Sequence, residues 1–165
     1  MNHTKQSLNY RIRPAQLADI PDILALFADE VIAGRMLPRS KVVMQANIHD
    51  WRVADINDEI VGCVSLVFYS QTLCEIRSLA VAKRFRQNGL GKRMVEEALV
   101  LARERGAEGV LTLTRVPGLF EHSGFQKSDI HKFPEKVQQD CQPCPFINQC
   151  DEIALLYKFK ESEIN

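Results

Sequence analysis

A short basic segment with two glycines carries the strongest chemical signal in the sequence. Residues 86 to 91 read Arg-Gln-Asn-Gly-Leu-Gly and lie between a predicted strand and a predicted amphipathic helix. Gly89 and Gly91 would let the backbone approach a ligand closely, because glycine has no Cβ atom. The first amides of the following helix lack intrahelical partners and lie at the positive end of the helix dipole. The segment therefore favours a phosphate, although it matches neither the P-loop nor the G-x-G-x-x-G pattern.

Apolar spacing and turn residues predict the elements that must position this segment. Strands are expected over residues 10 to 15, 53 to 56, 60 to 68, 74 to 81, 108 to 116 and 151 to 159. Helices are expected over residues 17 to 34, 37 to 48, 89 to 105, 117 to 123 and, as one or two turns, 133 to 141. Asp19 and Ser40 can cap the first two helices, and Asn57-Asp58 is suited to a hairpin turn. The order predicts an α/β or α+β protein with a mixed sheet flanked by helices.

The composition is that of an ordinary globular protein and argues against a nonspecific nucleic-acid binder or a membrane protein. The 165 residues fit one domain, and 45% of them are hydrophobic. The 21 Lys and Arg balance the 21 Asp and Glu, whereas a nonspecific nucleic-acid binder would carry excess positive charge. No apolar run approaches the roughly 18 residues that a membrane span needs, and the N-terminus lacks a signal-peptide core. We therefore expect a cytoplasmic protein with no nucleic-acid or membrane partner, in which residues 1 to 9 form a flexible tail.

Three cysteines gather in an irregular segment that we expect over residues 131 to 151. Their spacing, Cys141-x2-Cys144-x5-Cys150, is not that of a zinc site, which needs four ligands in two close pairs. A nearby histidine or aspartate would have to supply a fourth ligand. We expect no metal here, and interpret the segment as a compact, proline-rich loop with reduced thiols or one adventitious disulfide.

The phosphate-binding pattern and its neighbours together resemble one enzyme superfamily. Arg86-x-x-Gly89-x-Gly91 is similar to the acetyl-coenzyme A motif, [RQ]-x-x-G-x-[GA], of the GNAT acetyltransferases. The sequence "IRSLAV" (76 to 81) resembles the strand before that motif, and "LFEHSGF" (119 to 125) resembles a segment after it. The resemblance covers most of the chain, and it implies a mostly antiparallel sheet with a splayed central strand pair.

The resemblance also implies how acetyl-coenzyme A would bind as co-substrate. Backbone amides of residues 86 to 91 would hold the pyrophosphate, and backbone groups of Leu79 and Val81 would bind the pantetheine arm. An amide near Leu79 would polarise the thioester carbonyl, as an oxyanion hole does. The residues expected to contact the cofactor are Leu79, Val81, Arg86, Gln87, Asn88, Gly89, Leu90, Gly91 and Lys92.

An amine must lose a proton before it can accept an acyl group. Glu75 begins the strand beside the expected cofactor position and could take this proton directly or through water; the alternative is a glutamate whose carboxylate lies in solvent. Many members of the family have a tyrosine that protonates the leaving thiolate. Here the matching residue is Phe120, which has no proton to give.

Within the superfamily, four stretches resemble the short, single-domain N-acetylglutamate synthases. They are "GRMLPRS" (34 to 40), residues 74 to 81, "LTLTRVPGLFEHSGF" (111 to 125) and "DCQPCPFINQCDEIALL" (140 to 156). This resemblance implies L-glutamate as the acceptor, in the first step of arginine biosynthesis. Guanidinium groups suit its two carboxylates, so the candidate substrate-binding residues are Arg39, Arg77 and Arg115. Strand alternation places Arg77 on the same face as Glu75 and Leu79.

Other functions remain open at this point. Each of the three arginines could instead form a surface salt bridge. The acceptor could be a polyamine, an antibiotic or a protein N-terminus, and Phe120 is compatible with a non-catalytic acetyl-coenzyme A sensor. A homodimer is possible.

Overall fold

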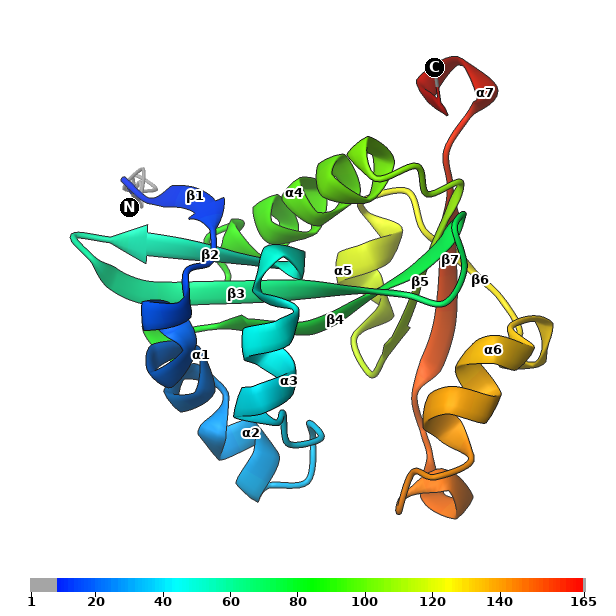
Figure 1. Cartoon of the computed structure of the whole chain (residues 1–165), viewed down its shortest axis with the longest axis horizontal. Coiled ribbons are helices and arrows are strands. Elements are labelled where there is room, and N and C mark those ends of the chain that lie inside the picture. The colour runs from blue at the N-terminus through cyan, green and yellow to red at the C-terminus, as the bar shows by residue number, and fades with distance from the viewer. Residues whose placement is uncertain (1–8, 165) are drawn as a thin grey trace, which may run out of the picture. The chain divides into compact units, whose positions relative to one another are not determined.

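Hydrogen-bonded strands follow one another in the order β1-β2-β3-β4-β5-β7-β6 (Figure 1). This computed structural model describes residues 9 to 164, so residues 1 to 8 of the expected tail lie outside the described residues. The strands are β1 (Arg11–Pro14), β2 (Trp51–Ile56), β3 (Glu59–Phe68), β4 (Leu73–Val81), β5 (Gly109–Thr114), β6 (Gln126–Lys127) and β7 (Ile153–Lys158). The β4–β5 pair is parallel, whereas β1–β2, β2–β3, β5–β7 and β6–β7 are antiparallel. The predicted mixed, mostly antiparallel sheet is therefore confirmed.

The described chain divides into two compact units. The first contains the residues up to Ser65 together with Ser78–Ala98, and the second contains Leu66–Arg77 and the residues from Leu99 onwards. Strands β3 and β4 thus contribute residues to both units. A single domain over residues 1 to 165 stays a prediction.

Three short helices cover the apolar core of the first unit. They are α1 (Ile20–Leu26), α2 (Ala28–Ile32) and α3 (Lys41–Ala46). The single helix predicted over residues 17 to 34 is wrong in one respect, because a non-helical residue, Phe27, separates α1 from α2 and buries its ring in this core. The buried members of the core are Ala15, Ile20, Ile23, Phe27, Met44, Ile48, Trp51, Val53, Ile60, Cys63 and Ala80.

The two predicted helix caps have different outcomes. The Ser40 hydroxyl accepts a hydrogen bond from the Val43 amide at 3.4 Å, so this cap is confirmed. Asp19 precedes α1 as predicted, but its carboxylate does not cap that helix. It forms two hydrogen bonds with the Arg13 guanidinium, at 2.7 and 3.0 Å, and accepts another from the Gln16 amide. A charged partner on β1 therefore binds the carboxylate that was predicted to cap α1, and the bond from the Gln16 amide belongs to the 3₁₀ turn Leu17–Asp19.

The predicted turn between β2 and β3 is present. Asn57 and Asp58 have φ angles of 50° and 65°, which are the left-handed values that a two-residue hairpin requires. Asparagine and aspartate tolerate this conformation better than other non-glycine residues do. The turn therefore fixes the register of the hairpin on which the first unit's core is built.

The second unit is built around β5 and β7. These strands pair from Gly109↔Lys158 to Thr114↔Ile153, and β6 adds a short edge that the sequence did not predict. A small core there contains Leu111, Phe133 and Ala154. The helices of this unit are α5 (Pro117–Glu121), α6 (Pro134–Lys136) with a π-helical turn at Val137–Cys141, and α7 (Glu161–Ile164).

The longest helix, α4 (Leu90–Glu104), matches the helix predicted over residues 89 to 105. Gly106, which follows its end, has a φ of 86° and so adopts the left-handed conformation that commonly terminates a helix. Within residues 9 to 164, no helix combines the length and apolar character needed to cross a membrane.

Arg13 should contribute strongly to the stability of the first unit, because its guanidinium pairs at 2.7 Å both with Asp19 and with the nearly buried Asp55. Without Arg13, the Asp19 carboxylate loses its cation, whereas Asp55 keeps its pair with Arg11 at 3.1 Å. Because breaking a buried ion pair leaves a charge without its partner, Arg13→Ala should lower the free energy of unfolding by about 3 kcal/mol at pH 7. Chemical denaturation followed by circular dichroism measures this change. Lys83→Ala is the matched control, because it removes only an exposed pair with Asp29.

The same pairing should make stability depend on pH. The hydrogen bond from Arg13 lowers the pKa of Asp19; burial raises the pKa of Asp55, but hydrogen bonds from Arg13 and Arg11 outweigh it and lower that pKa. Such a carboxyl group contributes stability that is complete above its unfolded pKa of about 4 and is lost as pH falls through the folded pKa. Wild-type protein should therefore lose stability on acidification more steeply than Arg13→Ala, and parallel acid profiles would contradict this account.

Candidate functional site

The segment between β4 and α4 has the backbone geometry of an anion-binding turn. Gln87 and Gly89 both have left-handed φ angles, of 64° and 83°. A Cβ atom at Gly89 would meet no atom within 4 Å, so this side of the turn faces open space. The Arg93 amide bonds to the Gly89 carbonyl at 3.1 Å, which places the amides of residues 90 to 92 in the first turn of α4. Those amides are the groups that a helix cannot satisfy internally.

Basic side chains around this turn are held by acidic partners in the first unit. Arg86 donates through Nε to the Val81 carbonyl at 2.9 Å and lies 3.5 Å from Glu30. Lys83 pairs with Asp29 at 3.2 Å. These residues line an open pocket of about 380 Å³. The basic side chains in these pairs remain largely exposed. An incoming phosphate could therefore replace their acidic partners at little cost in free energy.

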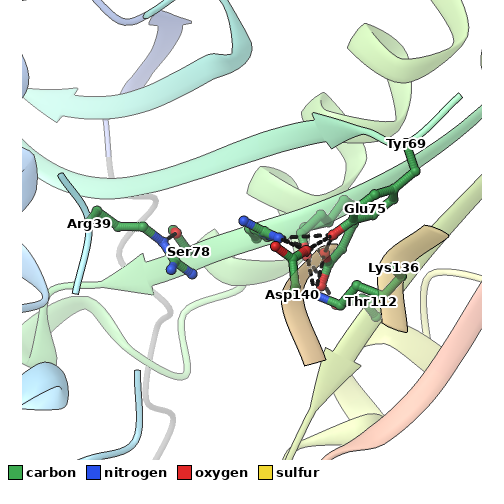
Figure 2. Close-up of polar contacts among 9 residues, drawn as sticks. Arg39, Tyr69, Glu75, Ser78, Thr112, Lys136 and Asp140 are labelled. Atoms are coloured by element: carbon green, nitrogen blue, oxygen red, sulfur yellow. Dashed lines mark hydrogen bonds and ion pairs between the residues drawn. The ribbon is translucent and has the colours of Figure 1, made fainter. Parts of the chain in front are cut away.

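Strand β4 is irregular at Ser78, close to the residues expected to bind the pantetheine arm. Ser78 has a φ of 52°, a value that is uncommon for a residue other than glycine. Its hydroxyl accepts a hydrogen bond from Arg39 Nε at 2.8 Å (Figure 2). Its carbonyl accepts one from the Cys63 thiol at 3.3 Å. The regular alternation predicted from Glu75 to Leu79 is therefore interrupted at Ser78, and the face of Leu79 does not follow from that of Arg77.

The parallel ladder between β4 and β5 is short. Its register pairs run from Leu73↔Gly109 to Glu75↔Leu111. One residue further on, the Thr112 hydroxyl donates to the Ile76 carbonyl at 3.3 Å, so a side chain serves a backbone group there. The last paired residue of β4 in this ladder is thus Glu75, the predicted base.

Glu75 lies at the centre of a buried polar cluster in the second unit, which we call the Glu75 cluster (Figure 2). Its Oε2 atom accepts hydrogen bonds from Lys136 Nζ at 2.8 Å, from Arg77 Nε at 3.0 Å and from the Tyr69 hydroxyl. Asp140 Oδ2 also contacts Lys136, at 3.2 Å, and contacts Arg77 and Tyr69. Arg77 further donates to the Tyr69 oxygen at 2.9 Å.

The charges of this cluster balance, since two carboxylates face two cations. The side chains of Glu75 and Lys136 are only 5% and 8% exposed, and buried charges are stable only when they are paired. Burial raises the pKa of Tyr69, so its hydroxyl keeps its proton. Burial also raises the pKa of Asp140, but the hydrogen bond from Tyr69 and the charges of Lys136 and Arg77 outweigh it and hold that pKa below its usual value.

The two oxygens of Glu75 differ in their surroundings. All three hydrogen bonds go to Oε2, and Oε1 has no partner among the described residues. No buried side-chain oxygen in the described part of the chain lacks a partner, so Oε1 is not fully enclosed. The carboxylate is therefore held through one oxygen while the other can accept a proton or a hydrogen bond.

The structure distributes the predicted site residues over both units. Arg39 and the cofactor-binding residues from Leu79 to Lys92 belong to the first unit, whereas Glu75, Arg77 and Arg115 belong to the second. Glu75 and Arg77 are brought into contact. Arg115 pairs instead with two acidic residues that precede β7, namely Asp151 at 2.7 Å and Glu152 at 3.6 Å.

Tyr69, Lys136 and Asp140 were not predicted from the sequence as site residues. Lys136 and Asp140 stand four residues apart, as neighbours on a helical surface do, but such pairs are common on solvated helices. Only their burial against Glu75 distinguishes this pair.

Phe120 and the three clustered cysteines have no polar role in the contacts observed. The Phe120 ring is buried and packs edge-on against Phe125, with 5.4 Å between ring centroids. Cys141, Cys144 and Cys150 are free thiols. Among residues 9 to 164, no group of three or more potential ligands could hold a metal ion.

Comparison with known proteins identifies the family. Residues 22–125 match the acetyltransferase (GNAT) family. An uncharacterised N-acetyltransferase from Chlorobaculum tepidum is 38% identical over 145 residues, which are 88% of this chain and 94% of that protein. An amino-acid acetyltransferase from Pasteurella multocida is 28% identical over 130 residues, or 78% of this chain but only 30% of that longer protein.

A solved structure shows the same arrangement of elements. N-acetylglutamate synthase from Neisseria gonorrhoeae, complexed with coenzyme A and N-acetyl-glutamate, aligns with a TM-score of 0.82 at 25% identity. The alignment covers 94% of this chain and 36% of that one. With the family match over the anion-binding turn, these findings show that the chain belongs to the GNAT family of acetyltransferases and uses acetyl-coenzyme A.

Proposed function

We propose that this protein transfers the acetyl group of acetyl-coenzyme A to the amino group of L-glutamate, the first step of arginine biosynthesis. The observation that carries the catalytic part is the Glu75 carboxylate, which three hydrogen bonds hold through Oε2. The likeness to N-acetylglutamate synthase over 94% of the chain supports the choice of glutamate. A polyamine, antibiotic or peptide acceptor would find no comparable support.

In the proposed reaction, the turn over residues 86 to 91 and Lys92 bind the pyrophosphate, and Val81 binds the pantetheine arm. Glu75 takes a proton from the substrate ammonium, and the neutral amine attacks the thioester carbonyl while the Leu79 amide stabilises the developing oxyanion. The thiolate of coenzyme A leaves without help from Phe120, and no covalent enzyme intermediate forms.

Arg39 is the first candidate to bind a glutamate carboxylate, because the Ser78 hydroxyl on β4 holds its guanidinium in place. Arg115 is the second candidate, but a substrate would have to displace Asp151 or Glu152 from it. Arg77 is engaged by Glu75 and Asp140, so we assign it to positioning Glu75 and not to contacting the substrate.

The cofactor site is tested by Gly91→Asp, which would place a side chain and a negative charge where the phosphates are expected. Titration calorimetry should show the affinity for acetyl-coenzyme A falling at least tenfold, or about 1.4 kcal/mol. Val100→Asp adds the same charge at an exposed position later in α4 and should bind normally. Unchanged affinity in a folded Gly91→Asp protein would place the site elsewhere.

The role of Glu75 is tested by Glu75→Gln, which removes the proton acceptor while keeping the shape of the side chain. The turnover number should fall by about 10²–10⁴-fold at neutral pH. The loss should shrink at high pH, where more of the amine is already neutral. Wild-type turnover at neutral pH, in a variant whose circular dichroism spectrum is unchanged, would eliminate this role.

The acceptor is tested by comparing the twenty amino acids with acetyl-coenzyme A and measuring release of coenzyme A. Glutamate should be strongly preferred to glutamine, since a neutral amide cannot form the charge-assisted bond that a carboxylate forms with an arginine. Arg39→Ala should raise the Michaelis constant for glutamate at least tenfold and leave that for acetyl-coenzyme A unchanged. The control is Arg35→Ala, which removes an exposed arginine paired with Glu30.

The outcomes of this screen separate the proposed functions. Equal efficiency with glutamate and glutamine would argue against the paired-charge account. The absence of coenzyme A release with every amine tested would favour the non-catalytic acetyl-coenzyme A sensor, with which Phe120 is compatible.

A further inference from the structure

A proton that Glu75 takes from the substrate must leave before the next turnover. The Glu75 side chain is only 5% exposed and is paired with Lys136 and Arg77. Within residues 9 to 164, the one uncharged side chain seen to hydrogen-bond to Glu75 is Tyr69, whose hydroxyl also contacts Asp140 (Figure 2). The Asp140 side chain is 22% exposed, so the chain of contacts runs from a buried carboxylate to one that reaches water.

The contacts of the Tyr69 oxygen suit the transfer of a proton. A hydroxyl has one hydrogen and two lone pairs, so it can donate to only one of the two carboxylates at a time. It can accept a hydrogen bond from the other when that group is protonated. Because burial raises the pKa of Tyr69, the phenol stays neutral between turnovers and transmits a proton without storing charge.

We propose that Tyr69 and Asp140 form a proton relay that returns Glu75 to its ionised form. This inference rests on the proposed role of Glu75 as base and does not depend on which amine is the acceptor. It makes Tyr69 and Asp140 relay residues that never touch the substrate.

Each step of the relay conserves protons. The protonated Glu75 carboxyl turns so that its O–H faces Tyr69 and donates its proton to the Tyr69 oxygen. The Tyr69 O–H bond breaks as its own proton passes to Asp140, and Asp140 releases that proton to water. Rotation of the Tyr69 hydroxyl from Glu75 back towards Asp140 completes the cycle, with one proton moved from the substrate to solvent.

The cations of the cluster give the relay its direction. Lys136 and Arg77 contact both carboxylates and stabilise them in the ionised form, and they hold the pKa of Asp140 below its usual value. Asp140 is therefore unprotonated before each turnover and gives up a proton readily. The other titratable groups that act electrostatically on Glu75 are Cys74, Cys141 and Glu152.

Tyr69→Phe and Asp140→Asn interrupt the relay while keeping the side-chain volume and Glu75 itself. With the amine that the wild-type enzyme accepts best, each variant should lower the turnover number at least tenfold at pH 7 and low buffer concentration. The Michaelis constants should stay within twofold. Adding imidazole, a small base that can carry protons, should restore turnover in Asp140→Asn and leave the wild type unchanged.

One control variant and two possible outcomes distinguish the relay from the proposed base and from a folding defect. Asp140→Glu retains an exposed acid and should keep most of the turnover. Slow Glu75→Gln with wild-type rates in both relay variants would overturn the relay but leave the base intact. Reduced turnover that imidazole does not restore, in variants with a lowered unfolding midpoint, would mean that the two residues act only as structural support and would also overturn it.

Discussion

The second unit depends on burying four charges and one phenol together. Glu75 and Lys136 are almost fully enclosed, and each is tolerated only because Arg77, Asp140 and Tyr69 complete its pairing. The cluster joins the end of β3, the start of β4 and the turn Val137–Cys141, so it ties a tail segment with little regular structure to two strands. Each carboxylate contacts both cations, so removal of any one charge would leave the cluster with an excess of the opposite charge in a largely buried position.

The elements that the sequence predicted well are those whose cause is local. Asn57-Asp58 forms its turn because these residue types tolerate positive φ, and Ser40 caps α3 with its own hydroxyl. The prediction of the first helix failed at positions whose structure depends on residues far away in the sequence. Arg13 on β1 takes the Asp19 carboxylate away from the helix end, and the core accommodates Phe27 at a break. The sequence of the predicted helix contains no pattern that indicates either the pairing of Asp19 with Arg13 or the break at Phe27.

The candidate site likewise has one part that the sequence predicted and one part that it did not. The anion-binding turn is contiguous in sequence, so its glycines and basic residues could be recognised together. The Glu75 cluster joins residues separated by up to 71 positions, and each member has an unremarkable sequence context. Lys136 and Asp140 have the spacing of many exposed helical pairs, and Tyr69 follows a strand whose aromatic residues could equally serve packing. Burial gives these residues their chemical meaning, and burial is set by tertiary structure.

The boundary of the family match also divides the Glu75 cluster. The family match ends at residue 125, after the anion-binding turn and Glu75 but before Lys136 and Asp140. The partners of Arg115, Asp151 and Glu152, likewise follow it. The part of the chain within the family match therefore contains the segment predicted to bind the cofactor together with Glu75 and Arg77, whereas the segment after residue 125 adds Lys136 and Asp140. A carboxylate held through one oxygen acts differently from one free in solvent, so the tail segment helps to decide which chemistry the shared fold performs.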